Sequence, residues 1–343
     1  MKTSRCCGHL APERIFFISL MSVFVFSAIG LSCFFDLAPA WAQGKPTARI
    51  SIATGGTGGV YYVLGGGIAA VISKHVPGVE ATAEVTAAGI DNCKLIMTRK
   101  ADLALVQTDY GYEAYAGMVR FQSTGKIPLR VLAVLYPAIS QIVTVEGTGI
   151  NEAKDLKGKR VSTGAAGSGS EAVAFKIFEA LGIDPNKDIR RERLSVAESA
   201  GAVKDRKLHA FFFCAGIPTA AVLDLASTPG FKIKLIAHDD LLERINKKYG
   251  PFYYRLVIPR ETYPGMTHPV PVIATGNALV CHEQLEERIA YGVVKAIIEQ
   301  REELKTVHKE AERITLENAV TGSAIPFHPG AIKYYKERKV WPQ

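Results

Sequence analysis

Two kinds of hydrophobic pattern alternate along the chain, one typical of strands and one typical of helices. Runs in which apolar residues alternate or follow one another predict strands, and runs with apolar residues three and four positions apart predict helices. From Arg49 onward the two kinds of run follow each other as strand, helix, strand. This order predicts an α/β fold built on parallel sheets with right-handed crossovers.

The predicted elements share these patterns and are bounded by Gly, Pro and polar residues. The strands are Arg49–Ala53, Val79–Thr86, Ala101–Val106, Arg130–Tyr136, Gln141–Val145, Arg160–Thr163, Ile189–Leu194, His209–Cys214, Lys232–Ala237 and Val272–Cys281. The helices are Val60–His75, Ile90–Thr98, Tyr110–Val119, Asn151–Leu156, Glu171–Leu181, Ala197–Arg206, Thr219–Ala226 and Leu285–Leu304. Pro137 is expected to separate two of the strands.

The stretch Ile50–Gly67 joins a strand to a helix through a loop of glycines around Thr57. The pattern recurs after Arg160–Thr163, where a glycine-serine loop, Gly164–Ser170, precedes a helix. Such loops let a ligand approach the backbone, and the free amides of the helix that follows attract anions. A tight turn with no ligand is the alternative interpretation.

The recurrence predicts two lobes, one inserted into the other. The chain is expected to leave lobe I, residues 43–139 and 270–343, for lobe II, residues 140–269, and two crossing strands would form a hinge. Ligands of open α/β sheets bind beyond the carboxyl ends of the strands. The cleft between the lobes would therefore have four loops on its walls: Thr54–Tyr62, Gln107–Tyr110, Gly164–Ser170 and Ala215–Thr219.

The four wall loops contain no Lys, Arg or His, so an anion there would rest on amides, hydroxyls and helix dipoles. Tyr61 and Tyr62 could close over an apolar part of the ligand. Asp109 is either a helix N-cap or an acceptor for a ligand ammonium group, and the serines are either caps or ligand contacts. The candidate ligand-binding residues are Thr57, Gly58, Gly59, Tyr61, Gln107, Thr108, Asp109, Gly167, Ser168, Gly169, Ser170, Ala215 and Gly216.

The sequence offers only weak matches to motifs for catalysis and cofactor binding. Ala166–Ser170 lacks the two glycines of a nucleophile elbow, and Gly65–Ala70 lies within a helix, where its glycines indicate close packing. We expect no metal site and no cofactor. Of six cysteines, Cys93, Cys214 and Cys281 lie beyond the N-terminal segment, and we expect buried small side chains, with a disulfide as the alternative.

The first 42 residues have the pattern of a signal peptide. Lys2 and Arg5 precede the uncharged apolar run Ile15–Phe35, and Ala40-Trp41-Ala42 is a cleavage signal. An uncleaved anchor and a lipoprotein signal at Cys33 are alternatives. The formal net charge is +8, but the basic residues are spread along the chain, which argues against nucleic acid as a partner.

Six stretches, taken together and in order, resemble the TAXI-type solute receptors of tripartite ATP-independent periplasmic (TRAP) transporters. They are Ala53–Tyr62, Ala101–Asp109, Asp155–Val161, Gly167–Ser170, Ala210–Gly216 with Pro218, and Ile325–Gly330. The resemblance covers the chain from Ile50 to about Lys336. Cys214 departs from it, because the resemblance implies an aliphatic or small residue there.

The resemblance implies a type II periplasmic-binding-protein fold, with two Rossmann-like lobes that close on a small solute. It implies a periplasmic, non-enzymatic receptor, expected to be a monomer, that delivers a small carboxylate or amino acid to the TRAP permease subunits. Glutamate and 2-oxoglutarate are among the family's solutes. The implied binding positions are Thr57, Gly58, Tyr61, Gln107, Ser168, Gly169, Ser170 and Gly216. A ligand sensor for a membrane kinase and, less favoured, an enzyme are the alternatives.

Overall fold

The computed structural model describes residues 47–342. The expected signal peptide, residues 1–42, therefore lies outside the described residues, as do its two alternatives. Within residues 47–342, none of the helices has the length and apolar character needed to cross a membrane.

The described residues form one ten-stranded sheet in the order β2-β1-β3-β10-β4-β7-β5-β6, with β8 paired to β4 and β9 paired to β10. Its strands are β1 Ala48–Ala53, β2 Val79–Glu84, β3 Leu103–Gln107, β4 Leu129–Val145, β5 Arg160–Ser162, β6 Arg190–Glu192, β7 Ala210–Ala215, β8 Ile233–Leu235, β9 Tyr254–Ile258 and β10 Val270–His282. β1 is parallel to β2 and β3, and β5 is parallel to β6 and β7, as the strand–helix–strand order predicts.

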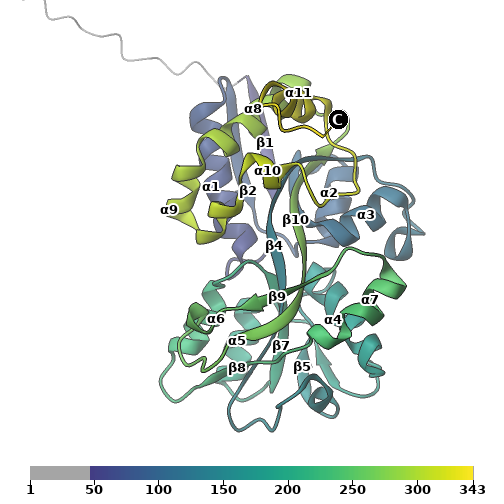
Figure 1. The fold of residues 1–343 in the computed structure, drawn as a ribbon, viewed down its shortest axis with the longest axis vertical. Helices are drawn as coiled ribbons and strands as arrows, with labels where there is room; N and C mark the ends of the chain where they lie inside the picture. The colour runs from purple at the N-terminus through teal and green to yellow at the C-terminus, as the bar shows by residue number, and fades with distance from the viewer. Residues whose placement is uncertain (1–46, 343) are drawn as a thin grey trace, which may run out of the picture. The chain divides into compact units, whose positions relative to one another are not determined.

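Helices connect the parallel strands and cover the sheet (Figure 1). They are α1 Val60–His75, α2 Ile90–Met97, α3 Thr108–Ala116, α4 Gly169–Leu181, α5 Val196–Lys204, α6 Ala220–Ser227, α7 Leu242–Tyr249, α8 Glu287–Glu299, α9 Arg301–Val307, α10 Leu316–Ala319 and α11 Pro329–Glu337. Short 3₁₀ turns are η1 Val119–Phe121, η2 Ala153–Leu156, η3 Asp239–Leu241, η4 Arg260–Thr262 and η5 Lys309–Arg313.

The two antiparallel strands β4 and β10 run through both halves of the sheet (Figure 1). One end of the pair packs with β1, β3 and α1, where Leu132 and Leu279 join one apolar cluster. At the other end Ile142 and Ile273 join a separate cluster with Phe178 of α4. We call the part built on β1–β3 lobe I and the part built on β5–β9 lobe II. Of the described strands, only β4 and β10 belong to both lobes, which is the geometry of a two-strand hinge.

The expected break at Pro137 is wrong, because β4 continues through this residue. Pro137 faces Gly276 of β10 where the register of the pair shifts, and β7 begins to pair with β4 only at Ile139. On the side of β7, Pro137 therefore has no partner strand, so a missing N–H on that side breaks no ladder hydrogen bond.

Two further expectations differ from the structure. The predicted helix Leu285–Leu304 is interrupted at Gln300, which separates α8 from α9. The segment between Ala237 and Pro264, for which the pattern predicts no element, contains α7 and β9. α7 is only eight residues long, is mostly polar and buries only Ile245.

The glycines in the middle of α1 confirm the expectation of close packing. A Cβ on Gly65 would lie 2.4 Å from Cγ2 of Thr54, and one on Gly67 would lie 3.1 Å from Val307 of α9. A Cβ on Gly66 between them would meet no atom within 4 Å among the described residues. Gly65 and Gly67 thus let α1 approach β1 and α9, whereas Gly66 makes no such contact.

Candidate functional site

A pocket of about 70 Å³ lies between the lobes, beyond the carboxyl ends of the parallel strands. Since a cavity needs only about 10–15 Å³ to hold a water and each water takes about 30 Å³ of liquid, the pocket has room for about two waters or a few heavy atoms of a ligand. Its walls are formed by Gly55, Gly56, Gly59, Val60, Tyr61, Thr86, Ala87, Ala88, Gln107, Tyr110, Gly164, Ala165, Ser168, Gly169, Ser170, Ser195, Val196, Phe213, Cys214 and Ala215.

Several helices begin at the pocket wall. Gly59, Gln107, Ser168 and Ser195 are the N-cap residues of α1, α3, α4 and α5, and each of them lines the pocket. The first N–H groups of a helix have no intrahelical partner and carry a partial positive charge. No Asp, Glu, Lys, Arg or His is found among the described lining residues. The electrostatics therefore favour an anion without a countercharge on a side chain.

Two serines at the start of α4 provide hydroxyl groups. Ser168 Oγ accepts from the N–H of Glu171 at 3.1 Å, so it caps the helix and lines the pocket at once. Ser170 Oγ accepts from the N–H of Cys214 at 3.0 Å, which fixes α4 to β7. In both bonds the oxygen is the acceptor, so each hydroxyl keeps its hydrogen for donation to a ligand.

Gln107 is an enclosed polar side chain of the pocket wall, with 2% of its surface exposed. Its Nε2 donates to the carbonyl of Cys214 across the lobes at 3.3 Å, and its main-chain N–H donates to the hydroxyl of Tyr110 at 2.8 Å. Its Oε1 has no hydrogen-bond partner among the described residues. A buried acceptor without a partner is costly, so this oxygen is suited to a ligand N–H or O–H.

Tyr61 lines the pocket, and its hydroxyl donates to Oδ1 of Asn277. Burial raises the pKa of Tyr61 well above its ordinary value, so the side chain stays neutral. Phe213 of β7 adds a second ring to the wall. Tyr62 lies outside the wall and is 36% exposed, so only the first of the two expected tyrosines contributes a surface for the apolar part of a ligand.

The structure brings together Gly59, Tyr61, Gln107, Ser168, Gly169, Ser170 and Ala215 of the candidate residues. The others do not line the pocket. Thr57 is exposed, and Oγ1 of Thr108 lies 3.3 Å from Oγ1 of Thr275. Gly58, Gly167 and Gly216 instead allow the lobes to meet, because a Cβ on them would contact Ala197, Asp91 and Glu310, respectively.

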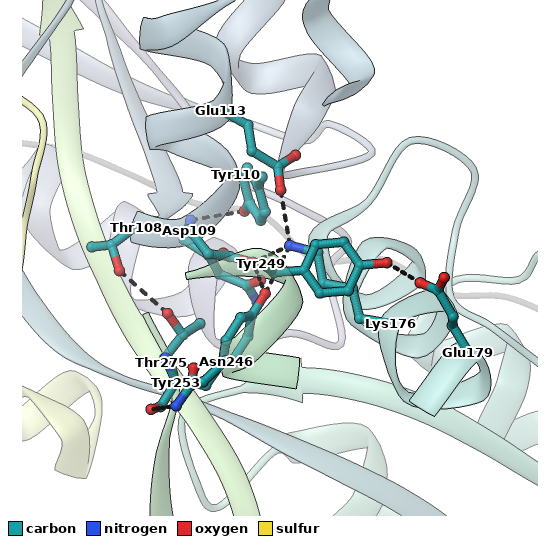
Figure 2. A network of polar contacts seen from close by, with 11 residues as sticks. Thr108, Asp109, Tyr110, Glu113, Lys176, Glu179, Asn246, Tyr249, Tyr253 and Thr275 are labelled. Atoms are coloured by element: carbon teal, nitrogen blue, oxygen red, sulfur yellow. Dashed lines mark hydrogen bonds and ion pairs between the residues drawn. The ribbon is translucent and has the colours of Figure 1, made fainter. Parts of the chain in front are cut away.

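For Asp109 the structure contradicts both interpretations drawn from the sequence, a helix N-cap and a ligand contact (Figure 2). It is neither the N-cap of α3, which is Gln107, nor a residue of the pocket wall. Its Oδ2 lies 3.0 Å from Nζ of Lys176 and accepts from the hydroxyl of Tyr253. Burial acts to raise the pKa of Asp109, but Lys176 and the Tyr253 hydrogen bond outweigh it and lower the pKa below its ordinary value.

Sequence reasoning missed the wall contributed by the loops after β2 and β6. Thr86, Ala87 and Ala88 follow β2, and Ser195 and Val196 follow β6. Both strands are parallel members of the sheet, so the carboxyl-end rule that selected the other four loops applies to them too. In the structure Ala88 has a left-handed backbone, with φ 67°, which is uncommon for alanine and which its residue type did not indicate.

The three described cysteines are free and buried, which confirms the expectation of small buried side chains. Burial raises the pKa of the Cys214 thiol in the pocket wall far above its ordinary range, so it is a neutral group there. Residues 47–342 contain no group of His, Cys, Asp and Glu side chains arranged to hold a metal ion.

Residues 52–338 match the NMT1-like family. Among solved structures, MatC from Rhodopseudomonas palustris with bound malate is 13% identical over 78% of this chain and 89% of that chain, with a TM-score of 0.51. A protein from Bordetella bronchiseptica RB50 is 16% identical over 87% and 90%, with a TM-score of 0.50.

The periplasmic aliphatic sulphonate binding protein SsuA from Escherichia coli is 14% identical over 84% of this chain and 83% of that chain, with a TM-score of 0.44. At such low identities, the likeness to the two structures with TM-scores of 0.51 and 0.50 supports the fold alone. The expected periplasmic-binding-protein fold, with two lobes joined by two strands, is confirmed.

Proposed function

Because this chain belongs to the NMT1-like family, we propose that it is an exported solute receptor that captures a small carboxylate or amino acid between its lobes. In this proposal lobe I comprises residues 43–139 and 270–343 and lobe II residues 140–269. The receptor delivers its solute to the membrane permease of a TRAP transporter, as the TAXI-like motifs imply. The periplasm is its compartment, and residues 1–42 are its signal peptide.

The observation that carries the proposal is the convergence of the starts of four helices on a pocket whose described lining residues are all uncharged. A carboxylate satisfies several free N–H groups at once, and it does so without a buried arginine. The two serine hydroxyls add donors of the same kind. The unpartnered Oε1 of Gln107 offers an acceptor for a ligand donor, such as the ammonium group of an amino acid.

Small monocarboxylates and dicarboxylates, with L-glutamate and 2-oxoglutarate among them, form the test panel. The full chain is expressed, the exported protein is purified, and its unfolding midpoint is measured with each compound. A compound that binds only the folded protein stabilises it by about 2.7 kcal/mol at a hundredfold excess over its Kd. Diamines serve as the opposite-charge control, and stabilisation by diamines alone would contradict the proposal. The panel is repeated on protein unfolded and refolded, which removes any solute that co-purifies.

A matched pair of variants tests the position of the site. Ser168→Gly removes the hydroxyl but keeps an acceptable helix N-cap, so stability changes by only a few tenths of a kcal/mol. We expect its affinity for the stabilising compound to fall about tenfold, since a hydrogen bond to a charged group contributes about 1.5 kcal/mol or more. Thr57→Val is the control, because Thr57 lies outside the pocket wall. If the two variants bound the stabilising compound with equal affinity, the solute would bind outside this pocket.

A further inference from the structure

Lys176 of α4 joins lobe II to lobe I through a buried polar cluster (Figure 2). Its Nζ lies 3.0 Å from Oδ2 of Asp109 and 2.9 Å from Oε1 of Glu113, both on α3 of lobe I. It also donates to the hydroxyl of Tyr253 in lobe II at 2.8 Å. One ammonium group therefore uses its three donors on three partners, two of which belong to the other lobe.

All three charged side chains are withdrawn from water. The exposed fractions are 5% for the side chain of Lys176, 1% for Asp109 and 11% for Glu113. Such charges are tolerated only when they are paired and hydrogen-bonded. When the lobes separate, both sides of the cluster return to water, so their pairing belongs to the arrangement in which the lobes are in contact.

The cluster lies beside the pocket but is not part of its wall. Lys176, Asp109 and Glu113 are absent from the lining residues, whereas Tyr110, next to Asp109, is present. Two turns before Lys176, the same helix α4 starts at Ser168–Ser170, the serine wall of the pocket. Pairing Lys176 with α3 thus draws the N-terminus of α4 toward Tyr110 and Gln107, and it does so without contact to a solute.

We propose that Lys176 is a positioning residue for solute capture, which holds lobe II against lobe I through Asp109 and Glu113. The proposal rests on the proposed receptor function, because it assumes that the lobes open and close. The two acidic partners differ in role. Asp109 binds both Lys176 and Tyr253, whereas Glu113 is the second negative charge facing a single ammonium group.

One further charged group acts on the cluster, because the cation of Arg120 in η1 lowers the pKa of Glu113 against the raising effect of burial. The ring of Tyr249 on α7 lies 4.9 Å from Nζ of Lys176, and its hydroxyl is bound to Glu179. Glu179 also pairs with Lys248, and these two residues both belong to lobe II. Lys248 therefore offers a matched control, a lysine of the same neighbourhood whose ion pair does not cross the lobes.

Hydrogen exchange without solute tests the proposal apart from solute binding. Two amides report on lobe contact, because the N–H of Ile90 donates to Gly167 O at 3.1 Å and that of Ile217 to Oε1 of Glu310 at 2.9 Å. In Lys176→Met we expect these amides to exchange roughly 100-fold faster, since two buried carboxylates lose their cation. Amides inside β1 and β7 keep their wild-type rates, and Lys248→Met leaves all rates unchanged.

Equal acceleration of all amides would mean general destabilisation, and unchanged rates at Ile90 and Ile217 would mean that the lobes do not depend on Lys176. Either result overturns the proposal. If Lys176→Met does not fold, Asp109→Asn replaces it, with the same expected acceleration. Glu113→Gln should change the rates less than threefold, because its amide oxygen still accepts from Lys176 and the remaining charges are balanced. An acceleration in Glu113→Gln as large as in Asp109→Asn would overturn the distinction between the two acids.

Discussion

Gly169 lies against Tyr110 so closely that a Cβ on it would fall 2.5 Å from Cε1 of the ring and 2.8 Å from Oε1 of Gln107. The glycine belongs to the start of α4 in lobe II, and the tyrosine belongs to α3 in lobe I. The two lobes therefore meet at a point where only hydrogen fits. This contact also forms part of the pocket wall.

Gly169→Ala should consequently prevent the lobes from meeting while each lobe stays folded. We expect the radius of gyration from small-angle X-ray scattering to increase and the affinity for the stabilising solute to fall at least about tenfold, because a clash with a packed ring must be relieved by lobe separation. Gly201→Ala is the control, since Gly201 on α5 has no neighbour within 4 Å. A variant with wild-type scattering and affinity would show that Tyr110 yields instead.

Adjacent glycines of α1 should respond to alanine in opposite directions. Gly66→Ala meets no neighbour within 4 Å and is expected to raise the free energy of unfolding by about 0.5–1 kcal/mol, because alanine favours the helix. Gly65→Ala places a Cβ 2.4 Å from Cγ2 of Thr54 and is expected to lower it by about 1–3 kcal/mol. Urea unfolding measures both values, and changes of the same sign would contradict the packing of α1 on β1.

His238 should make the protein less stable in acid. The side chain is fully buried, and its Nδ1 lies 2.9 Å from the carbonyl of Ile236, so Nδ1 carries the hydrogen of a neutral ring. Burial lowers the pKa of His238 from 6.5 to about 4. Between these values the unfolded chain binds a proton that the folded protein does not, so stability falls as the pH decreases through this window.

The loss attributable to His238 is about 3 kcal/mol at pH 4 relative to pH 7. Urea unfolding of wild type and His238→Asn at the two pH values isolates it, because asparagine keeps a donor for Ile236 but does not titrate. The variant should lose less stability on acidification by about that amount. An identical pH dependence in both proteins would show that the histidine is solvated or protonated in the folded state.

The glycine loops illustrate how far the sequence could predict the site. The sequence indicated that the loops after β1 and β5 precede helix starts, and Gly59, Ser168 and Ser170 do line the pocket. It could not tell which glycines face a ligand and which face the opposite lobe. Gly58 and Gly167 have the same local pattern as Gly59 and Gly169, yet they contact Ala197 and Asp91, respectively, instead of the cavity. Those neighbours lie far away in the chain.

Asp109 shows the same limit of sequence-based prediction for charged groups. A carboxylate in the first turn after β3 predicts a cap or a ligand contact, and both interpretations use only residues near it in sequence. Its actual partners, Lys176 and Tyr253, are 67 and 144 residues away and come from the other lobe. Neither was singled out in the sequence, because a lone lysine in an amphipathic helix is normally solvated.

The sequence by itself determined the alternation of strands and helices, the parallel pairing of β1 with β2 and β3 and of β5 with β6 and β7, and the placement of helix N-termini at the carboxyl edge of the sheet, whereas the antiparallel pairing of β4 and β10 with their neighbours was not predicted. These features depend on side-chain periodicity and on backbone geometry, which act over a few residues. Only the tertiary structure decided which glycines of the loops line the pocket and that Lys176 pairs with Asp109. Those features depend on contacts between the two lobes, and no local pattern encodes which surfaces meet when two folded halves close.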